Sequence, residues 1–197
     1  RRYFPTDAQM KSEIRKELGY TDDQKLILCI GELLPNKNQG MAIRMMAELV
    51  KKIPEAKLLL AGNGPERENL EGLIAELGLE EHVEMLDYCT YLEKYQKAVD
   101  LDISCSKREG LPLNVVESML TKNPVVLTKN RGHRELVKHE KTGYLVDVND
   151  VQKMTKYVAL LLRDEKHRTE MGEEAERFAK EFGFISVKKE LEKVYYL

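Results

Sequence analysis

Two carboxylates, Glu109 and Glu117, are the residues whose type and spacing suggest chemistry most directly. Seven residues stand between them. The apolar run 101–105 predicts a buried strand, Gly110 and Pro112 predict a turn after it, and apolar residues at helical spacing predict a helix that contains Glu117. Glu109 would then open the turn, with Glu117 about one helical turn inside the helix. Such a pair could hold two parts of one polar ligand, whereas Glu117 alone could equally be an exposed helix carboxylate.

A lysine follows the first predicted strand. Gly31 permits close approach of the backbone to a ligand, and Lys37 places an ammonium just before a helix. We interpret this loop as a phosphate-binding site, because an ammonium donates charge-assisted hydrogen bonds to phosphate oxygens. The alternative is a solvated surface lysine. After the second strand, residues 62–65 (Gly-Asn-Gly-Pro) form a glycine turn that lacks the third glycine of a dinucleotide fingerprint and is also compatible with a plain tight connection.

Strands and helices alternate along the chain and would position these side chains. The apolar runs predict strands at 26–31, 57–62, 83–86, 101–105, 124–128 and 144–146. Amphipathic patterns predict helices near 7–18, 39–52, 66–77, 92–98, 113–121, 131–138 and 150–162, and 164–196 is predicted to be all helix. This alternation indicates an α/β fold with a Rossmann-like, doubly wound parallel sheet. Ligands bind at the carboxyl ends of strands in such sheets, which is where Lys37 and Glu109 would lie.

The composition is that of an ordinary soluble protein. The 197 residues are 34% charged and 42% hydrophobic with a net charge of -2, so nothing favours nucleic acid as a partner. No apolar stretch reaches the ~20 residues of a membrane span and no secretory signal opens the chain, so we expect a cytoplasmic protein. Cys29 and Cys105 fall in predicted strands and are interpreted as core thiols. The chain starts at Arg1, and we expect that a segment upstream has been removed.

The order of motifs resembles a known family. It is similar to the C-terminal donor-binding domain of retaining GT-B-fold glycosyltransferases (glycosyl transferases group 1, or family 4), and most of all to bacterial enzymes of exopolysaccharide, capsule or lipopolysaccharide synthesis. The resemblance implies that residues 1–197 form one nucleotide-sugar-binding lobe with C-terminal helices, and that the N-terminal acceptor lobe is absent. The matching segments are Gly31 to Lys37, residues 62–65, Ser106 to Pro112, Glu117 to Met119, Pro124 to Val126, Arg131 to Val137 and Thr142 to Val146.

The resemblance also implies a role for each matching side chain. Glu109 would be the catalytic-site acid that faces the transferred sugar, Glu117 would accept hydrogen bonds from the ribose hydroxyls, and Lys37 and Gly31 would meet the diphosphate. An ionised carboxylate can accept two hydroxyl donors, which suits a ribose diol. Sugar or phosphate oxygens could also meet the backbone amides near Gly110, Leu111 and Leu113.

The implied reaction is transfer of a glycosyl group from a nucleoside diphosphate sugar, with uridine as the expected base, to an acceptor hydroxyl, with retention at the anomeric carbon. No metal or other cofactor is expected, because positive groups and helix-start amides would stabilise the departing diphosphate. The acceptor, a sugar or a lipid-linked sugar, would bind mainly to the missing lobe, so the fragment should bind donor and turn it over poorly. Peripheral membrane association of the full-length enzyme is part of this expectation.

Two departures from the family pattern affect the predicted site. Many relatives carry an arginine after the first-strand glycine, where this chain has Glu32. We predict that Arg131 or Arg134 supplies part of the missing positive charge, the alternative being pairing with acids such as Glu135. Tyr88 stands where relatives often have glycine, and it could border the base or be a half-buried strand-end residue.

Other interpretations stay open. His133 lies nearest the predicted donor pocket, yet by default it would be a surface histidine. A nucleotide-sugar epimerase of the same fold would use the same pocket but needs an acid and a base that the sequence does not identify. A non-catalytic sugar-nucleotide sensor would bind donor without reacting. Tyr195, Tyr196 and Leu197 at the end of the chain are expected to be exposed apolar residues that could promote dimerisation or aggregation.

Overall fold

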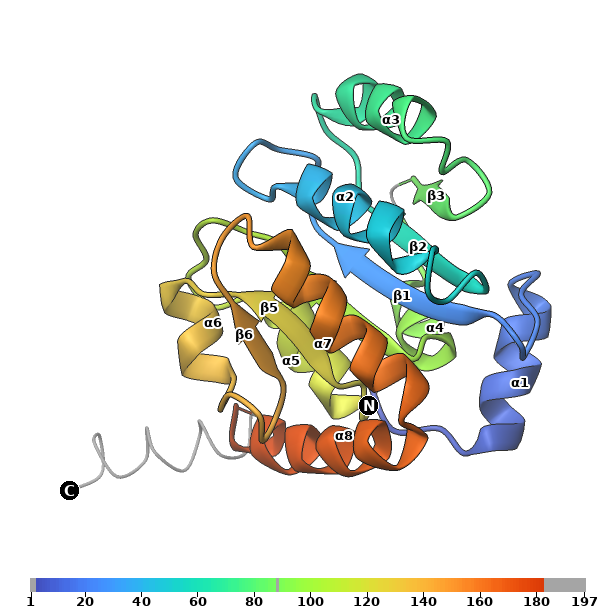
Figure 1. The fold of residues 1–197 in the computed structure, drawn as a ribbon. Coiled ribbons are helices and arrows are strands. Elements are labelled where there is room, and N and C mark those ends of the chain that lie inside the picture. Colours follow the sequence, from blue (N-terminus) through green and yellow to red (C-terminus); the bar gives the residue numbers. More distant parts are fainter. Residues whose placement is uncertain (1–2, 88, 183–197) are drawn as a thin grey trace.

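The computed structural model describes residues 3–87 and 89–182 and shows one parallel sheet covered by helices (Figure 1). The described residues form six strands in the order β3-β2-β1-β4-β5-β6. Each strand pairs with its neighbours in parallel. The strands are β1 (Lys25–Ile30), β2 (Ala56–Ala61), β3 (Val83–Leu86), β4 (Leu101–Ser104), β5 (Val125–Thr128) and β6 (Tyr144–Val146).

The strand order creates a switch point between β1 and β4. From β1 the chain builds outward to β2 and β3, and from β4 it builds in the opposite direction to β5 and β6. β1 and β4 are themselves paired, with Ile27 opposite Leu101. The loops that leave their carboxyl ends diverge, and a crevice at this place is where open α/β sheets bind ligands.

Helices cover both faces of the sheet. α2 (Gln39–Leu49), α3 (Arg67–Glu76) and α7 (Val151–Arg163) share one core with inward residues of the strands, including Ile27 and Cys29. The alternate residues Leu26 and Leu28 face the opposite side. That side is covered by α1 (Ala8–Glu17), α4 (Leu92–Ala98), α5 (Leu113–Leu120) and α8 (Glu165–Ala179), while α6 (Arg131–Leu136) follows β5 and a 3-10 helix (Lys180–Phe182) follows α8.

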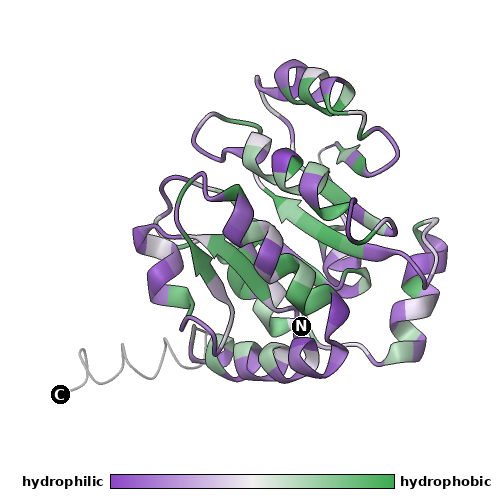
Figure 2. Cartoon of the chain, viewed as in Figure 1, coloured by the Kyte–Doolittle hydropathy of each residue, from purple (hydrophilic) through white to green (hydrophobic). Residues whose placement is uncertain are grey.

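The hydropathy pattern explains this layering. Figure 2 shows apolar residues along the central strands and polar residues on the outer faces of the helices. All four residues of β4 and of β5 are buried, as expected of a parallel sheet covered on both faces. Cys29 and Cys105 are buried core thiols as predicted, and burial raises the pKa of Cys29 to about 12. None of the described helices combines the length and the apolar character that crossing a membrane requires.

The predicted α/β fold is confirmed. Strands 83–86 and 144–146 have the predicted bounds, and the other four differ by a residue at one or both ends. The predicted helix 39–52 ends earlier, at Leu49, where turns lead to Pro54. Of the predicted helical segment 164–196, the structure describes the part up to Phe182, and Tyr195, Tyr196 and Leu197 lie outside the described residues.

Candidate functional site

The loops that leave β1 and β4 are joined by hydrogen bonds. The Lys107 amide donates to the Asn36 carbonyl at 2.8 Å, and the Asn36 side-chain amide donates to the Arg108 carbonyl at 3.0 Å. Asn38 begins α2 in a left-handed conformation, and its amide reaches the Cys105 carbonyl at 3.3 Å. These contacts hold the loop with Lys37 against the turn with Glu109.

Lys37 and Glu109 form an ion pair at the switch point. Lys37 Nζ lies 2.6 Å from Glu109 Oε1, and the two side chains are 25% and 14% exposed. Residues far apart in sequence meet here because β1 and β4 are neighbours in the sheet. Partial burial strengthens the attraction relative to a surface pair, yet both groups can still reach a ligand from solvent.

The glycine turn after β2 packs against the loop after β1. A Cβ atom on Gly62 would lie 2.0 Å from the Gly31 carbonyl oxygen, and one on Gly64 would lie 2.5 Å from the Leu33 carbonyl oxygen. Gly62 also has φ 147°, which L side chains rarely adopt. This contact favours the tight-connection interpretation of residues 62–65. The glycines are needed to let two loops touch.

An apolar cavity of about 390 Å³ lies over these glycine loops. Lys37 and Glu109 do not line it, so it adjoins the ion pair and does not enclose it. Its size and its position beside the switch point suit a flat ring system at one end of a ligand. It is lined by Ile30, Gly31, Glu32, Leu34, Ala61, Gly62, Asn63, Gly64, Pro65, Cys89 and Leu92.

Glu117 lies on α5, the helix that follows the Glu109 turn. Partial burial raises the pKa of its carboxyl group, and a hydrogen bond with Tyr3 opposes that rise. The helix is tied to the neighbouring strand, since the Asn114 side-chain amide donates to the Ile30 carbonyl at 3.2 Å. Leu111 and Leu113 at the start of α5 are 55% and 62% exposed, so the backbone there is open to solvent. In the described structure Glu117 contacts Tyr3, and its predicted role toward a ribose stays a prediction.

The two arginines predicted to share the diphosphate charge have acidic neighbours of their own. Arg131 is 89% exposed, and its Nε lies 3.4 Å from Glu135 Oε1. Arg134 is exposed, and its charge contributes to lowering the pKa of Asp147. The pairing alternative is therefore what the structure shows for Arg131. Tyr88, the predicted base-bordering residue, lies outside the described residues.

The expectation of a surface histidine at position 133 is wrong. His133 is 0% exposed. Its Nδ1 lies 2.7 Å from the Thr128 carbonyl oxygen, and its backbone N–H donates to the side chain of Asn130, which caps α6. Asn130 before the predicted helix is an N-cap signal in the sequence, but the burial of the imidazole depends on its contact with Thr128.

The turn between β5 and α6 supports the turn that carries Glu109. The Thr128 hydroxyl and the Asn130 amide donate to the Ser106 carbonyl at 2.6 and 2.9 Å. The Gly132 amide donates to the Glu109 carbonyl at 3.2 Å. Sequence reasoning had missed all of these supporting residues, since their effect on Glu109 is exerted through backbone atoms.

Replacing Gly132 with alanine should displace the Glu109 turn. A Cβ atom at position 132 would lie 2.2 Å from the Gly110 carbonyl oxygen, so either the turn or α6 must move. We expect the free energy of unfolding, measured by urea denaturation, to fall by about 1–3 kcal/mol. Gly72→Ala is the matched control, because nothing lies within 4 Å of a Cβ there and alanine favours the helix. Equal stability of both variants would contradict the close packing.

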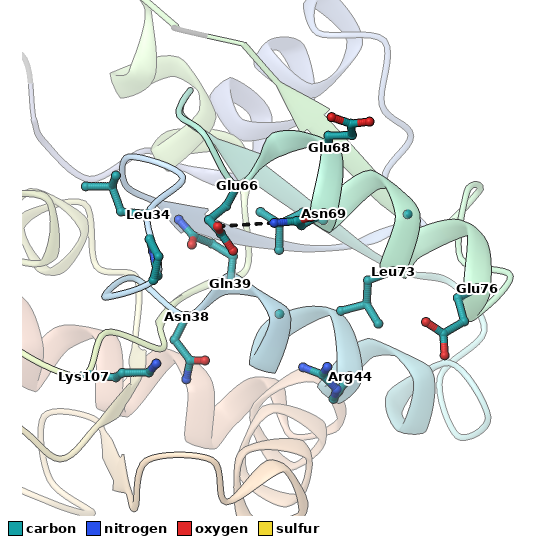
Figure 3. A pocket seen from close by; sticks show the side chains of 14 residues that line it. Leu34, Asn38, Gln39, Arg44, Glu66, Glu68, Asn69, Leu73, Glu76 and Lys107 are labelled. Atoms are coloured by element: carbon teal, nitrogen blue, oxygen red, sulfur yellow. Dashed lines mark hydrogen bonds between the residues drawn. The ribbon is translucent and has the colours of Figure 1, made fainter.

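A second cavity lies in the groove between α2 and α3, and neither Lys37 nor Glu109 lines it (Figure 3). Its volume is about 670 Å³. Arg44 and Lys107 contribute positive charge to its lining, and Glu66 and Glu76 contribute negative charge. Because its lining carries charges of both signs, it is a poorer candidate for an anionic ligand than the switch point.

Comparisons with known proteins agree with the fold. The profile of the family described as Glycosyl transferases group 1 matches residues 10–178. EpsD of Bacillus subtilis (strain 168), described as a glycosyltransferase, is 28% identical over 194 residues, which is 98% of this chain and 51% of EpsD. An α-1,4-N-acetyl-D-galactosaminyltransferase of Campylobacter jejuni, named for an undecaprenol-linked acceptor, is 31% identical over 194 residues, which is 95% of this chain and 50% of the relative. This chain thus spans about half the length of these relatives.

A solved structure shares the whole arrangement. Anabaena Alr3699/HepE in complex with UDP superposes with a TM-score of 0.89 at 25% identity, covering 98% of this chain and 54% of HepE. The six-stranded parallel sheet, the flanking helices and the family profile thus lead to one conclusion. The chain belongs to the Glycosyl transferases group 1 family and has the fold of one lobe of a GT-B glycosyltransferase.

Proposed function

We propose that this chain is the donor-binding lobe of a retaining glycosyltransferase that takes a nucleoside diphosphate sugar, with a UDP-sugar as the donor. The likeness to HepE, which was solved with UDP and with UDP and glucose, supports the uridine base. The acceptor is a sugar or a lipid-linked sugar used in surface polysaccharide synthesis. The name of the Campylobacter jejuni relative, which gives an undecaprenol-linked acceptor, supports that class.

The observation that carries the proposal is the Lys37–Glu109 ion pair at the switch point. A diphosphate brings two negative charges and several acceptor oxygens to this place, and it can compete with one carboxylate for the Lys37 ammonium. When Lys37 turns to the diphosphate, Glu109 is released to accept hydrogen bonds from hydroxyl groups of the transferred sugar. Binding of the diphosphate would thus free Glu109 to bind the sugar of the same donor.

The other parts of the donor fit the surrounding elements. The nucleoside base would occupy the apolar cavity over the glycine loops, and Glu117 would accept hydrogen bonds from the ribose hydroxyls. Amide groups at the start of α5, where Leu111 and Leu113 are exposed, would meet diphosphate oxygens, because helix starts favour anions.

The reaction follows from the charge that develops in it. As the bond between the anomeric carbon and the diphosphate breaks, negative charge accumulates on the leaving phosphate. Lys37 and the amides of α5 would stabilise that charge, which lowers the barrier because they are already in place. The acceptor hydroxyl would attack from the partner lobe, and retention of anomeric configuration is the outcome that the family resemblance implies.

Removing either donor-binding side chain should weaken nucleotide binding. Lys37→Ala loses a charge-assisted hydrogen bond worth about 1.5–3 kcal/mol, so we expect the dissociation constant for UDP-glucose to rise by about one to two orders of magnitude. Glu117→Ala should weaken binding of UDP by a comparable factor. Isothermal titration calorimetry with uridine, guanosine and adenosine diphosphates and their sugar conjugates would measure both effects and identify the base.

Two matched variants make this test specific. Lys107→Ala removes an exposed lysine from the same pair of loops, and it should leave affinity unchanged. Arg131→Ala tests whether that arginine shares the diphosphate charge, since a loss of affinity would assign it that role in spite of its contact with Glu135. Binding of no nucleotide by the unmodified chain would reject the proposed function.

A further inference from the structure

One ring nitrogen of His133 is a buried acceptor without a partner. His133 Nδ1 lies 2.7 Å from the Thr128 carbonyl oxygen, which can only accept, and 2.9 Å from the Asn130 side-chain amide nitrogen, which also donates to the Ser106 carbonyl. We place the proton on Nδ1, toward the closer Thr128 oxygen. His133 Nε2 then bears a lone pair. It is buried and has no hydrogen-bond partner among the described residues. Leaving an acceptor buried and unpaired costs free energy, which suggests that its partner arrives in another state of the protein.

His133 lies next to the turn that carries Glu109, since the amide of the preceding residue, Gly132, donates to the Glu109 carbonyl at 3.2 Å. Burial lowers the pKa of His133, the hydrogen bond with the Thr128 carbonyl and the negative charge of Glu109 act to raise it, and the positive charge of Lys37 acts to lower it. These are the two described charged side chains whose fields act on the imidazole. On its own helix, Arg131, Arg134 and Glu135 are exposed to solvent. Burial therefore favours the neutral imidazole while Lys37 stays with Glu109.

Donor binding would reverse this balance. In the proposed function, on which this inference rests, Lys37 leaves Glu109 for the diphosphate. The Glu109 carboxylate would then lack its cation, and the diphosphate would add further negative charge near the imidazole. Both changes favour a charged imidazole, and Nε2 is the atom that is free to take the proton.

We propose that His133 is a positioning residue for Glu109, which takes up one proton from solvent at Nε2 when a nucleoside diphosphate sugar binds and then replaces Lys37 as the cationic partner of the Glu109 carboxylate. Glu109 thereby stays oriented while Lys37 serves the diphosphate. A charged His133 would also add a second positive charge to that of Lys37. The family pattern has an arginine after Gly31 for this purpose, where this chain has Glu32.

The test is calorimetric titration of UDP-glucose in buffers of different ionisation enthalpy. UDP-glucose is the suitable probe because its diphosphate is esterified at both ends and does not titrate near neutral pH. We expect uptake of up to about one proton per donor near pH 7, and an affinity that falls by up to about tenfold per pH unit where uptake is greatest. Uptake should disappear in His133→Asn, whose side-chain amide can still donate to the Thr128 carbonyl.

A matched histidine provides the control. His82 Nδ1 also contacts a backbone carbonyl, that of Ala56 at 3.1 Å, so His82→Asn should bind UDP-glucose with the uptake of the unmodified chain. Binding without uptake, or with uptake that persists in His133→Asn, would overturn this inference and leave the proposed function standing. Failure of the unmodified chain to bind any nucleotide sugar would overturn both.

A measurement without ligand tests whether the charges of Lys37 and Glu109 act on His133. In NMR titrations of the imidazole nitrogens, Glu109→Gln should lower the pKa of His133 and Lys37→Met should raise it. This experiment does not depend on folding of His133→Asn or on knowledge of the base. A pKa that responds to neither substitution would show that the two charges do not act on His133 and would overturn the inference.

Discussion

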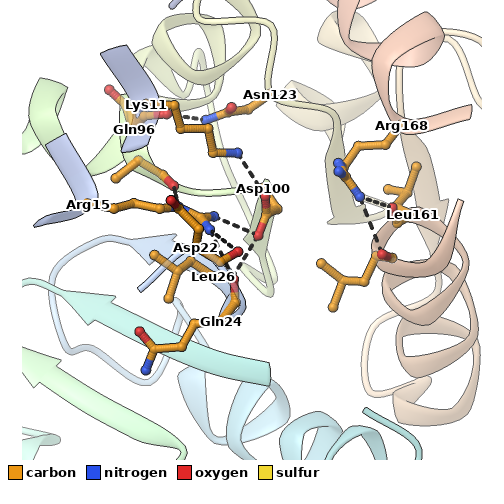
Figure 4. Close-up of polar contacts among 12 residues, drawn as sticks. Lys11, Arg15, Asp22, Gln24, Leu26, Gln96, Asp100, Asn123, Leu161 and Arg168 are labelled. Atoms are coloured by element: carbon orange, nitrogen blue, oxygen red, sulfur yellow. Dashed lines mark hydrogen bonds and ion pairs between the residues drawn. The ribbon is translucent and has the colours of Figure 1, made fainter. Parts of the chain in front are cut away.

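Replacing Asp100 with alanine should lower the free energy of unfolding by about 3–5 kcal/mol, because it leaves a buried charge without its partner. Asp100 joins α1 to the start of β1, at the amino ends of β1 and β4 and opposite the carboxyl ends that carry the donor site (Figure 4). Its carboxylate lies 2.7 Å from Lys11 Nζ and 2.9 Å from Arg15 Nη2, and it accepts the Leu26 amide at 2.9 Å. The Arg15 and Asp100 side chains are only 5% and 7% exposed. Chemical denaturation of the variant would measure the loss.

Glu48→Ala is the control for this prediction. Glu48 and Lys51 are also separated by 2.7 Å, but their side chains are 51% and 65% exposed, so water replaces the lost contact and stability should change little. Similar losses in the two variants would mean that burial does not set the strength of the Asp100 cluster.

The pH dependence of the Asp100 cluster can be stated in advance. Burial acts to raise the pKa of Asp100, but the charges of Lys11 and Arg15 outweigh it and hold the pKa below the usual 3.8. A depressed folded-state pKa stabilises the fold at every pH above 3.8, and this contribution is lost as the pH falls through the lower, folded value.

The fold could be predicted because each strand carries its own apolar signal. Leu26 and Leu28 face one core, and Ile27 and Cys29 face the other. Because both faces of a parallel strand are buried, its sequence is a continuous apolar run, and β1 has such a run. The helix bounds were harder to predict. α2 ends at Leu49 although Val50 and Lys51 fit a helix, because turns that lead into Pro54 take over there.

Site residues could be predicted from the sequence only where a charged residue follows a predicted strand. Lys37 and Glu109 were assigned to one ligand from their places after two strands, and the structure brings them to 2.6 Å. The sequence could not show that they would contact each other, because that depends on β1 and β4 being neighbours in the sheet. The burial of His133 could not be predicted for a related reason. It depends on the contacts of the imidazole with Thr128 and Asn130, in the turn that follows β5.

A second buried carboxyl group, Asp102 on β4, has no cationic partner among the residues that the structure describes. Its side chain accepts the Asn123 amide at 2.8 Å through Oδ2, whereas Oδ1 has no partner among the described residues. Gln96 Oε1 is likewise a buried acceptor without a partner, and the Gln96 backbone carbonyl accepts from the same Asn123 amide. Burial raises the pKa of Asp102 to about 7, and hydrogen bonds from Ser118 and Asn123 oppose that rise.

This carboxyl group should make the fold less stable as the pH rises through neutrality. The unfolded chain releases the proton near 3.8 and the folded chain near 7, so the folded state binds more protons in between, and its stability falls with pH across that window. Asp102→Asn keeps the shape, cannot ionise and supplies an N–H donor. We expect it to match the unmodified chain at pH 4 and to be more stable at pH 8 by about 2–4 kcal/mol, measured by urea denaturation at both pH values.

Asp147→Asn, at an exposed acid whose pKa is lowered by its hydrogen bond with Lys129, should give no such gain at pH 8. An Asp102→Asn curve that parallels the unmodified chain from pH 4 to pH 8 would show that Asp102 is ionised in the fold throughout, with a partner in the cluster that balances its charge.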